Sequence, residues 1–266
     1  FLLSGGLDSS LIASIAQRMV GKITTFSIGL EGSPDLEAAR KVSKFIGSDH
    51  HEVKFTVKEG LSTVASVIAA LETYDTTTVR AAVPMFLLCK YIKEKTSCRY
   101  IFSGEGADEL LGGYLYFKNA PGVQEFAMEN MRRLKLIHQF DGLRADRCTG
   151  AHGLDLVVPF LDAHVINACM EMNQREKMGP CEKRVLREAF IGYLPEEVLW
   201  RQKDGMSDAV GTQWVDALRQ KAETVITDTA FMVNRAVCGE HNTPLTKEEV
   251  WYREIFFSGV RPVALK

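Results

Sequence analysis

The sequence has no run of eighteen apolar residues, the length that a membrane-spanning helix requires, and no recognisable signal peptide. It also has no excess of positive charge, since 32 Lys and Arg residues stand against 34 Asp and Glu residues. Nucleic-acid-binding proteins generally carry a basic patch, so we expect neither a nucleic-acid nor a membrane partner. The six cysteines form no C-x-x-C pair, which predicts free thiols in a reducing, cytoplasmic compartment.

What the chain does contain is the composition of an ordinary globular protein, with 46% hydrophobic and 25% charged residues. Its 266 residues suffice for one large α/β domain or two small ones. The first residue is Phe1 rather than Met, and Phe1-Leu2-Leu3 has the apolar character of a buried strand. We therefore expect the sequence to begin inside a strand of a longer protein.

Strand-like and helix-like segments alternate over the first half of the chain. Strands are expected at 1–3, 23–30, 50–55 and 99–103, and helices at 9–20, 34–47, 56–71 and 81–95. Thr56 and Glu59 form a capping box that marks the start of the third helix. This order predicts a parallel twisted sheet with helices on both faces, in which ligands bind beyond the carboxyl ends of the strands.

Beyond about Tyr114 the strand signals fade. Helices are expected at 122–138, 161–172, 182–193, 207–226 and 246–257, and a second capping box at Thr246 and Glu249 opens the last of them. The predicted fold class is α/β with a mainly helical C-terminal half. The sequence leaves open whether that half is a separate domain or a layer that covers the sheet.

The first candidate site is Ser4-Gly5-Gly6-Leu7-Asp8-Ser9-Ser10, between a predicted strand and a predicted helix. The glycines let the backbone approach a ligand closely, and the serines lie where a helix N-terminus favours an anion. Asp8 would repel a bare phosphate, so it suggests a magnesium ion that bridges the carboxylate to phosphates. The segment lacks the Gly-Lys-Ser/Thr of a P-loop, and the simpler interpretation is a glycine turn with a serine cap.

The second candidate site is Ser103-Gly104-Glu105-Gly106-Ala107-Asp108-Glu109, followed by two more glycines at Gly112 and Gly113. Glycines and acids at the end of a strand make a poor core and a plausible active-site loop. Asp108 is suited to share a metal with Asp8, and Glu105 to contact an amine. The simpler interpretation is a solvated acidic turn.

Together the two segments resemble the synthetase domain of the asparagine synthetases, which belong to the N-type ATP pyrophosphatases with an adenine nucleotide alpha hydrolase-like fold. Further matches follow in the same order along nearly the whole chain. They are Gly32-Ser33-Pro34-Asp35-Leu36, Glu72-Thr73-Tyr74-Asp75, Thr77-Thr78-Val79-Arg80, Val158-Pro159-Phe160-Leu161-Asp162, Trp200-Arg201-Gln202-Lys203 and Ser207-Asp208.

The resemblance implies that the aspartate side chain attacks the α-phosphorus of ATP, that pyrophosphate leaves, and that ammonia converts β-aspartyl-AMP to asparagine and AMP. ATP is then a substrate and Mg²⁺ a cofactor. In this family an N-terminal glutaminase domain with a terminal Cys supplies the ammonia. Since none of the six cysteines here begins the chain, we expect residues 1–266 to be a synthetase domain with ammonia-dependent activity only. The sequence is compatible with a homodimer and does not fix the oligomeric state.

The family pattern also implies roles for individual positions. The nucleotide and pyrophosphate would be bound by Leu3, Ser4, Gly5, Gly6, Asp8, Ser9, Ser10, Ile28, Ser103 and Gly104. Magnesium would be held by Asp8 and Asp108. Contacts to aspartate, ammonia or the transition state would come from Thr77, Thr78, Arg80, Glu105 and Lys203.

Some positions depart from the family pattern. Val157 stands where Arg is common, Ala107 where Ser is common, and Asp204-Gly205-Met206 where Glu, a small or polar residue and Phe are usual. Because none of them falls on an expected metal or phosphate position, we expect activity. The alternatives are a related carboxylate-adenylating ligase such as a β-lactam synthetase, and a nucleotide-binding module without catalysis.

Overall fold

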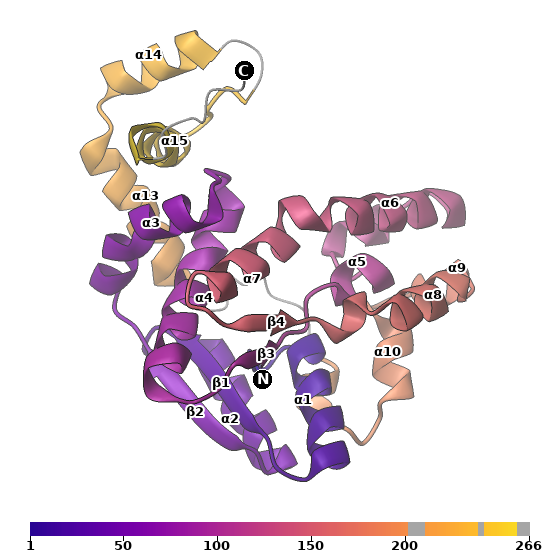
Figure 1. Cartoon of the computed structure of the whole chain (residues 1–266). Coiled ribbons are helices and arrows are strands. Elements are labelled where there is room, and N and C mark those ends of the chain that lie inside the picture. Colours follow the sequence, from indigo (N-terminus) through magenta and orange to yellow (C-terminus); the bar gives the residue numbers. More distant parts are fainter. Residues whose placement is uncertain (202–210, 239–241, 260–266) are drawn as a thin grey trace.

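The computed structural model describes residues 1–201, 211–238 and 242–259. Within them, short parallel strands pair two by two: β1 (Thr24–Gly29) with β2 (Asp49–Lys54), and β3 (Tyr100–Phe102) with β4 (Asp155–Val157). Residues 1–3 join the two pairs, because the amide of Leu3 donates to the carbonyl of Phe26 (2.8 Å) and that of Leu2 donates to Phe102 (2.9 Å). The fold is therefore mixed α/β, with small parallel sheets among many helices (Figure 1).

The first four helices separate the strands along the chain. They are α1 (Leu7–Val20), α2 (Pro34–Ile46), α3 (Val57–Leu71) and α4 (Thr76–Lys95). The later helices are α5 (Ala107–Leu111), α6 (Val123–Leu136), α7 (Asp141–Gly150), α8 (Ala163–Glu171), α9 (Gln174–Lys177), α10 (Arg184–Ala189), α11 (Glu196–Leu199), α13 (Thr212–Val225), α14 (Asp228–Cys238) and α15 (Lys247–Gly259).

Two apolar clusters hold helices against opposite faces of the strands. Neighbouring residues in an extended segment point to opposite sides, and Leu2 and Leu3 enter different clusters. Leu2 packs with Phe26 and with residues of α3, α4 and α7. Leu3 packs with residues of α1, α2 and α11. The strands therefore have helices on both sides, as the alternating sequence pattern predicts.

Several predicted element boundaries are confirmed. Helix α2 ends at Ile46, and Gly47, the predicted end, caps it in the left-handed conformation with φ of 71°. The capping box of α3 is complete: the Thr56 hydroxyl accepts from the amide of Glu59, and the Glu59 carboxylate accepts from the amide of Thr56. Local capping chemistry therefore sets these helix ends.

Other predictions need correction. Helix α4 begins at Thr76 rather than at Ala81, because Oδ1 of Asp75 accepts from the amide of Thr78 (2.8 Å) and caps the helix earlier. Strand β4 lies in the C-terminal half, which was expected to be mainly helical and for which no strand was predicted. It pairs with β3 and so extends the parallel arrangement with a strand from residues 155–157. Helices α7 and α14 were not predicted at all.

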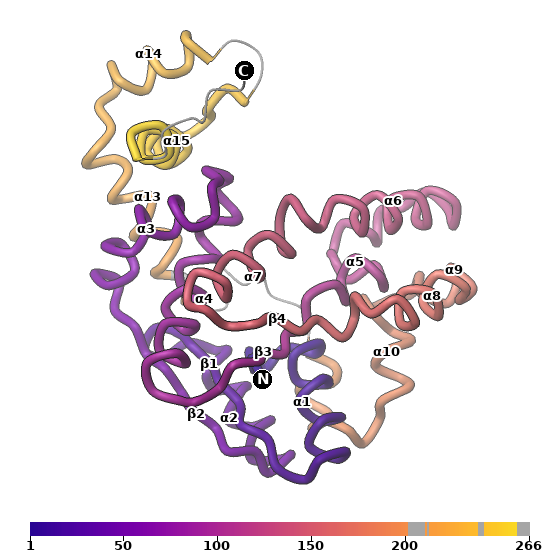
Figure 2. The backbone as a smooth tube through the Cα atoms, viewed as in Figure 1, coloured from indigo at the N-terminus to yellow at the C-terminus, as the bar shows by residue number. Residues whose placement is uncertain are grey.

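The C-terminal helices extend from the strand-containing part of the molecule, beyond α3 (Figures 1 and 2). Helices α13 and α15 contribute Trp214 and Tyr252 to the cluster that contains α3 and α4. Helix α14 has no buried residue. In the part of the chain that is described, no helix is both long and apolar enough to span a bilayer. All six cysteines are free thiols.

Candidate active site

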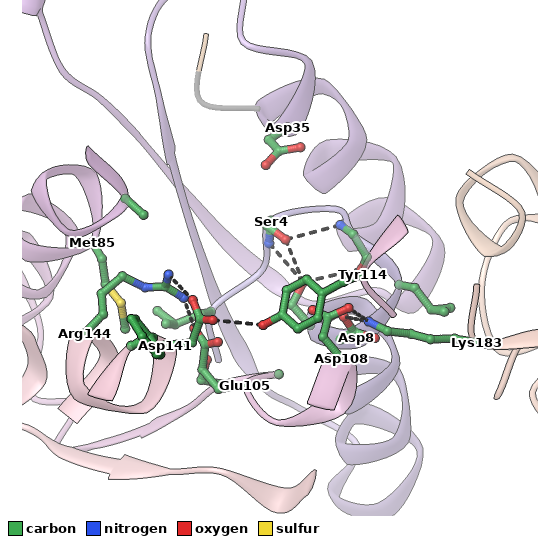
Figure 3. A pocket seen from close by; sticks show the side chains of 18 of the residues that line it. Ser4, Asp8, Asp35, Met85, Glu105, Asp108, Tyr114, Asp141, Arg144 and Lys183 are labelled. Atoms are coloured by element: carbon green, nitrogen blue, oxygen red, sulfur yellow. Dashed lines mark hydrogen bonds and ion pairs between the residues drawn. The ribbon is translucent and has the colours of Figure 1, made fainter. Parts of the chain in front are cut away.

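A pocket of about 540 Å³ lies where several loops and helix ends meet (Figure 3). It is lined by the loop that follows residues 1–3, the first two turns of α4, the loop that follows β3, the start of α7, and residues of the 182–187 segment. Because two of these loops directly follow parallel strands, the pocket lies where ligands bind in open α/β sheets.

The first loop is tied together by its own serines. The hydroxyls of Ser4 and Ser9 lie 3.0 Å apart, and the amide of Ser4 donates to the Ser9 hydroxyl at 3.2 Å. Gly5 has φ of 75°, and a Cβ there would lie 2.5 Å from Cβ of Ala38. Only glycine suits this position, since it tolerates both the positive φ and the approach of α2. The loop therefore presents the N-terminus of α1 to the pocket in a fixed conformation.

The second loop packs directly on the first. A Cβ at Gly104 would lie 2.8 Å from the amide nitrogen of Ser9 and 3.0 Å from Cβ of Asp8. The amide of Ser103 donates to the carbonyl of Val157 (3.0 Å), so β4 anchors the start of this loop. A glycine at position 104 thus allows two segments that are a hundred residues apart in sequence to form one wall of the pocket.

Asp8 and Asp108 converge on one ammonium group. Nζ of Lys183 lies 2.5 Å from Oδ2 of Asp8 and 2.6 Å from Oδ1 of Asp108. The Lys183 side chain is 2% exposed. Burial opposes its charge, but the two carboxylates outweigh burial and raise the pKa of the ammonium. Lys183 is therefore charged at neutral pH and balances one of the two negative charges.

The two carboxylates suit a magnesium ion in chemistry and position. Both line the pocket, and Mg²⁺ in proteins is commonly held by one or two carboxylates together with phosphates and water. Among the described residues, no group of three or more His, Cys, Asp or Glu side chains gathers as a metal site. A metal held by Asp8 and Asp108 would therefore need phosphate oxygens or water to complete its coordination.

A second charged group surrounds Arg144 at the start of α7. The guanidinium donates to Glu105 at 2.7 Å and to Asp141 at 2.5 Å. The hydroxyl of Tyr114 lies against Glu109 and 2.9 Å from Asp141. Burial raises the pKa of Glu105 although Arg144 opposes the shift, and burial raises the pKa of Glu109 to about 7. Glu105, which lines the pocket, and Glu109, which contacts the lining residue Tyr114, therefore hold their protons to a higher pH than exposed acids do.

Most of the residues singled out from the sequence line this pocket. They are Ser4, Gly6, Asp8, Ser9, Thr77, Thr78, Ser103, Gly104, Glu105 and Asp108. Among the described candidates, Leu3, Gly5, Ser10, Ile28 and Arg80 are not lining residues. Leu3 and Ile28 are buried in the two apolar clusters. Lys203 lies outside the described residues.

Arg80 points toward the C-terminal helices. Its Nε and Nη2 donate to the carboxylate of Glu248 at 2.8 and 2.6 Å. Arg80 is therefore held on a flank of α4, next to residues that line the pocket.

Several charged lining residues were not identified from the sequence as site residues. They are Asp35, Arg133, Asp141, Arg144, Glu182, Lys183, Arg187 and Arg201. Asp35 and Arg201 lie within segments that match the family pattern, and Arg201 donates to Asp35 at 3.2 Å. Nothing local in the sequence marks Lys183, because its partners Asp8 and Asp108 are far away along the chain.

Comparison with known proteins agrees with this geometry. The sequence model of the family described as "Asparagine synthase" matches residues 1–132 and 118–261. The chain is 46% identical over 274 residues to asparagine synthetase [glutamine-hydrolyzing] 1 of Lotus japonicus. This alignment covers 96% of this chain and 46% of the relative. It is also 46% identical to asparagine synthetase [glutamine-hydrolyzing] 1 of Saccharomyces cerevisiae, over 95% of this chain and 52% of the relative.

The chain thus spans about half the length of the curated relatives it matches. The matched regions include both loops of the pocket and the helices around it. This chain belongs to the asparagine synthase family.

Proposed function

We propose that this chain catalyses the ATP-dependent amidation of aspartate to asparagine, with release of AMP and pyrophosphate. The observation that carries the proposal is the convergence of the two glycine-containing loops, with Asp8 and Asp108, on a single pocket. The names of the relatives support the same reaction. The fold that we infer for it is one twisted parallel sheet, formed by the two strand pairs and residues 1–3 between them.

The pocket supplies the groups that the first step needs. The N-terminus of α1, with the hydroxyls of Ser4 and Ser9, binds the leaving pyrophosphate, because free amides and the helix dipole favour an anion. Lys183 and Arg201 both line the pocket and add positive charge as the α–β phosphate bond breaks. Transfers at phosphorus depend chiefly on such positioning and charge neutralisation.

Asp8 and Asp108 are the residues that would hold magnesium. When bound, Mg²⁺ neutralises phosphate charge and orients the chain of phosphates. Lys183 stays beside the same carboxylates and keeps them close together.

The aspartate substrate binds at the other end of the pocket, against the first turn of α4. Thr77, Thr78 and Glu105 all line the same pocket as the first loop. In the second step, the ammonia nitrogen attacks the activated carbonyl, AMP leaves, and the surplus proton of the nitrogen passes to the Glu105 carboxylate. Arg144 fixes that carboxylate by a 2.7 Å hydrogen bond.

The relatives' names support a proposal for the source of the ammonia. They are described as glutamine-hydrolysing, and this chain corresponds to about half of their length. We infer that residues 1–266 form the synthetase domain, that a glutaminase domain normally delivers ammonia to it, and that the protein works in the cytoplasm.

The test is incubation of the purified chain with aspartate, ATP, Mg²⁺ and ammonium. AMP, pyrophosphate and asparagine should form in equal amounts, and the exchange of Asp8→Asn should abolish pyrophosphate release. ADP in place of AMP would contradict the proposal. Release of pyrophosphate with larger carboxylates but not with aspartate would instead indicate a related ligase.

A further inference from the structure

Helix α4 contains a proline at a position that affects its first turns. Pro84 lies inside the helix. Proline has no N–H group, so the carbonyl of Arg80, four residues earlier, lacks its usual helical donor. A buried carbonyl without a donor is costly, and another part of the chain has to satisfy it.

The donor comes from helix α13. Nε1 of Trp214 donates to the carbonyl of Arg80 at 2.9 Å, and the Trp214 side chain is fully buried. Its ring packs edge-on against Phe55 and comes so close to α3 that a Cβ at Gly60 would lie 2.5 Å from it. The indole is therefore held rigidly where α4 needs a hydrogen bond.

Helix α15 holds the side chain of the same residue. The guanidinium of Arg80 makes two hydrogen bonds to the Glu248 carboxylate, at 2.8 and 2.6 Å. Glu248 is 2% exposed, and the fully buried Tyr252 donates to its Oε1 at 2.9 Å. The bidentate pair leaves the guanidinium little freedom to rotate.

Arg80 lies between residues that line the aspartate end of the pocket. Thr77 and Thr78 precede it by three and two residues, and Ala81 follows it. Main-chain and side-chain contacts from α13 and α15 thus meet at one residue of the turn that carries the two threonines. Any rotation of this turn would move Thr77 and Thr78 together.

We propose that Glu248 is a positioning residue for aspartate binding, which acts through Arg80 on the first turns of α4. The proposal rests on the proposed function, because it assigns the aspartate end of the pocket to Thr77 and Thr78. Glu248 itself does not line the pocket, so its effect is on the placement of other groups.

The variant that tests this is E248Q, compared with the matched control E254Q. Glu254 is an exposed residue on the same helix, and it accepts from Asn234 at 3.2 Å. We expect E248Q to raise the KM for aspartate about tenfold while the KM for ATP changes less than about twofold, as for other residues that orient a ligand-binding group. E254Q should match the wild type in both constants. A purely structural role would lower the active fraction, and so kcat, without separating the two KM values.

A double-mutant cycle with R80K tests whether the effect passes through Arg80. If it does, E248Q should add little to the KM of R80K, because contacting residues are not additive. Additive effects would overturn the proposal. Should E248Q fail to fold, Y252F removes only the hydroxyl that holds Glu248, and a rise of about threefold in the aspartate KM is expected.

Calorimetric binding of aspartate in the presence of a non-hydrolysable ATP analogue separates the two hypotheses. If the wild type binds aspartate, and E248Q and Y252F bind it with the same affinity as the wild type, the role of Glu248 alone would be overturned. A wild-type chain that binds no aspartate would overturn both that role and the proposed function.

Discussion

At the scale of single residues, the main feature of the pocket is the position of Lys183. Its ammonium lies between two carboxylates that the sequence suggests as magnesium ligands. The proximity of Asp8 and Asp108 was predicted from the two glycine-rich segments and from the family resemblance. Lys183 was not predicted, because 175 positions separate it from Asp8. Only the folded chain brings the three groups together, so no local pattern marks this lysine.

Replacing Lys183 should show what the lysine contributes. In K183M, the largely buried carboxylates of Asp8 and Asp108 lose the ammonium group of Lys183, and we expect a loss of roughly 3 kcal/mol in the free energy of unfolding. Mg²⁺ should then raise the melting temperature of K183M more than that of the wild type. Thermal unfolding in EDTA and in Mg²⁺ measures both effects.

Lys177→Met is the control for K183M. Lys177 is also buried, but its ammonium donates to the carbonyl of Leu110 and to the Asn130 amide oxygen rather than to carboxylates. Its replacement should destabilise the fold without any added response to Mg²⁺. An equal Mg²⁺ response in K177M and K183M would contradict the idea of a shared cation site.

His50 gives the fold a pH dependence. Its ring nitrogens lie 2.9 Å from the Thr25 hydroxyl and 3.1 Å from that of Ser27, and burial lowers its pKa below 6.5. Below pH 6.5 the unfolded chain therefore binds a proton more readily than the native chain, and stability falls as the pH falls. We expect H50Q to lose less stability than the wild type on acidification, as measured by urea unfolding. The exposed His164→Gln variant should behave like the wild type.

At the scale of elements, helix ends were predictable where a side chain caps them, as at Thr56 with Glu59. The start of α4 was missed because three threonines, poor helix formers, follow the capping Asp75. Strand β4 was missed because three residues carry too little alternation to be recognised. Its existence depends on pairing with β3, which is a tertiary contact.

The contact between the two loops should be sensitive to one added methyl group. G104A places a Cβ 2.8 Å from the amide of Ser9, so the loops must separate and shift Asp8. We expect kcat/KM for asparagine formation to fall about a hundredfold, the usual effect of a small misplacement in an active site. Gly150→Ala meets no atom within 4 Å and should retain full activity. Equal rates for both variants would show that the loops need no close contact.

At the scale of the whole molecule, stability should differ between the strand-containing part and the C-terminal helices. Helix α14 has no buried residue, and its Met232, Val233 and Val237 are exposed, whereas α4 is buried over much of its length. Regions with few buried contacts open more readily than the core. We expect the amides of α14 to exchange with solvent at least about ten times faster than those of α4, by mass spectrometry. Similar protection in both helices would indicate that α14 is covered in solution.

The proline in α4 also has a consequence for the order in which the protein can mature on the ribosome. The turn that carries Thr77 and Thr78 is synthesised early, but the indole and carboxylate that complete it belong to residues 214 and 248. If Thr77 and Thr78 bind aspartate as we propose, a nascent chain that has not yet exposed those residues lacks the contacts that position them. On this proposal, chains that terminate before residue 248 would not complete the first turns of α4 and would bind aspartate poorly.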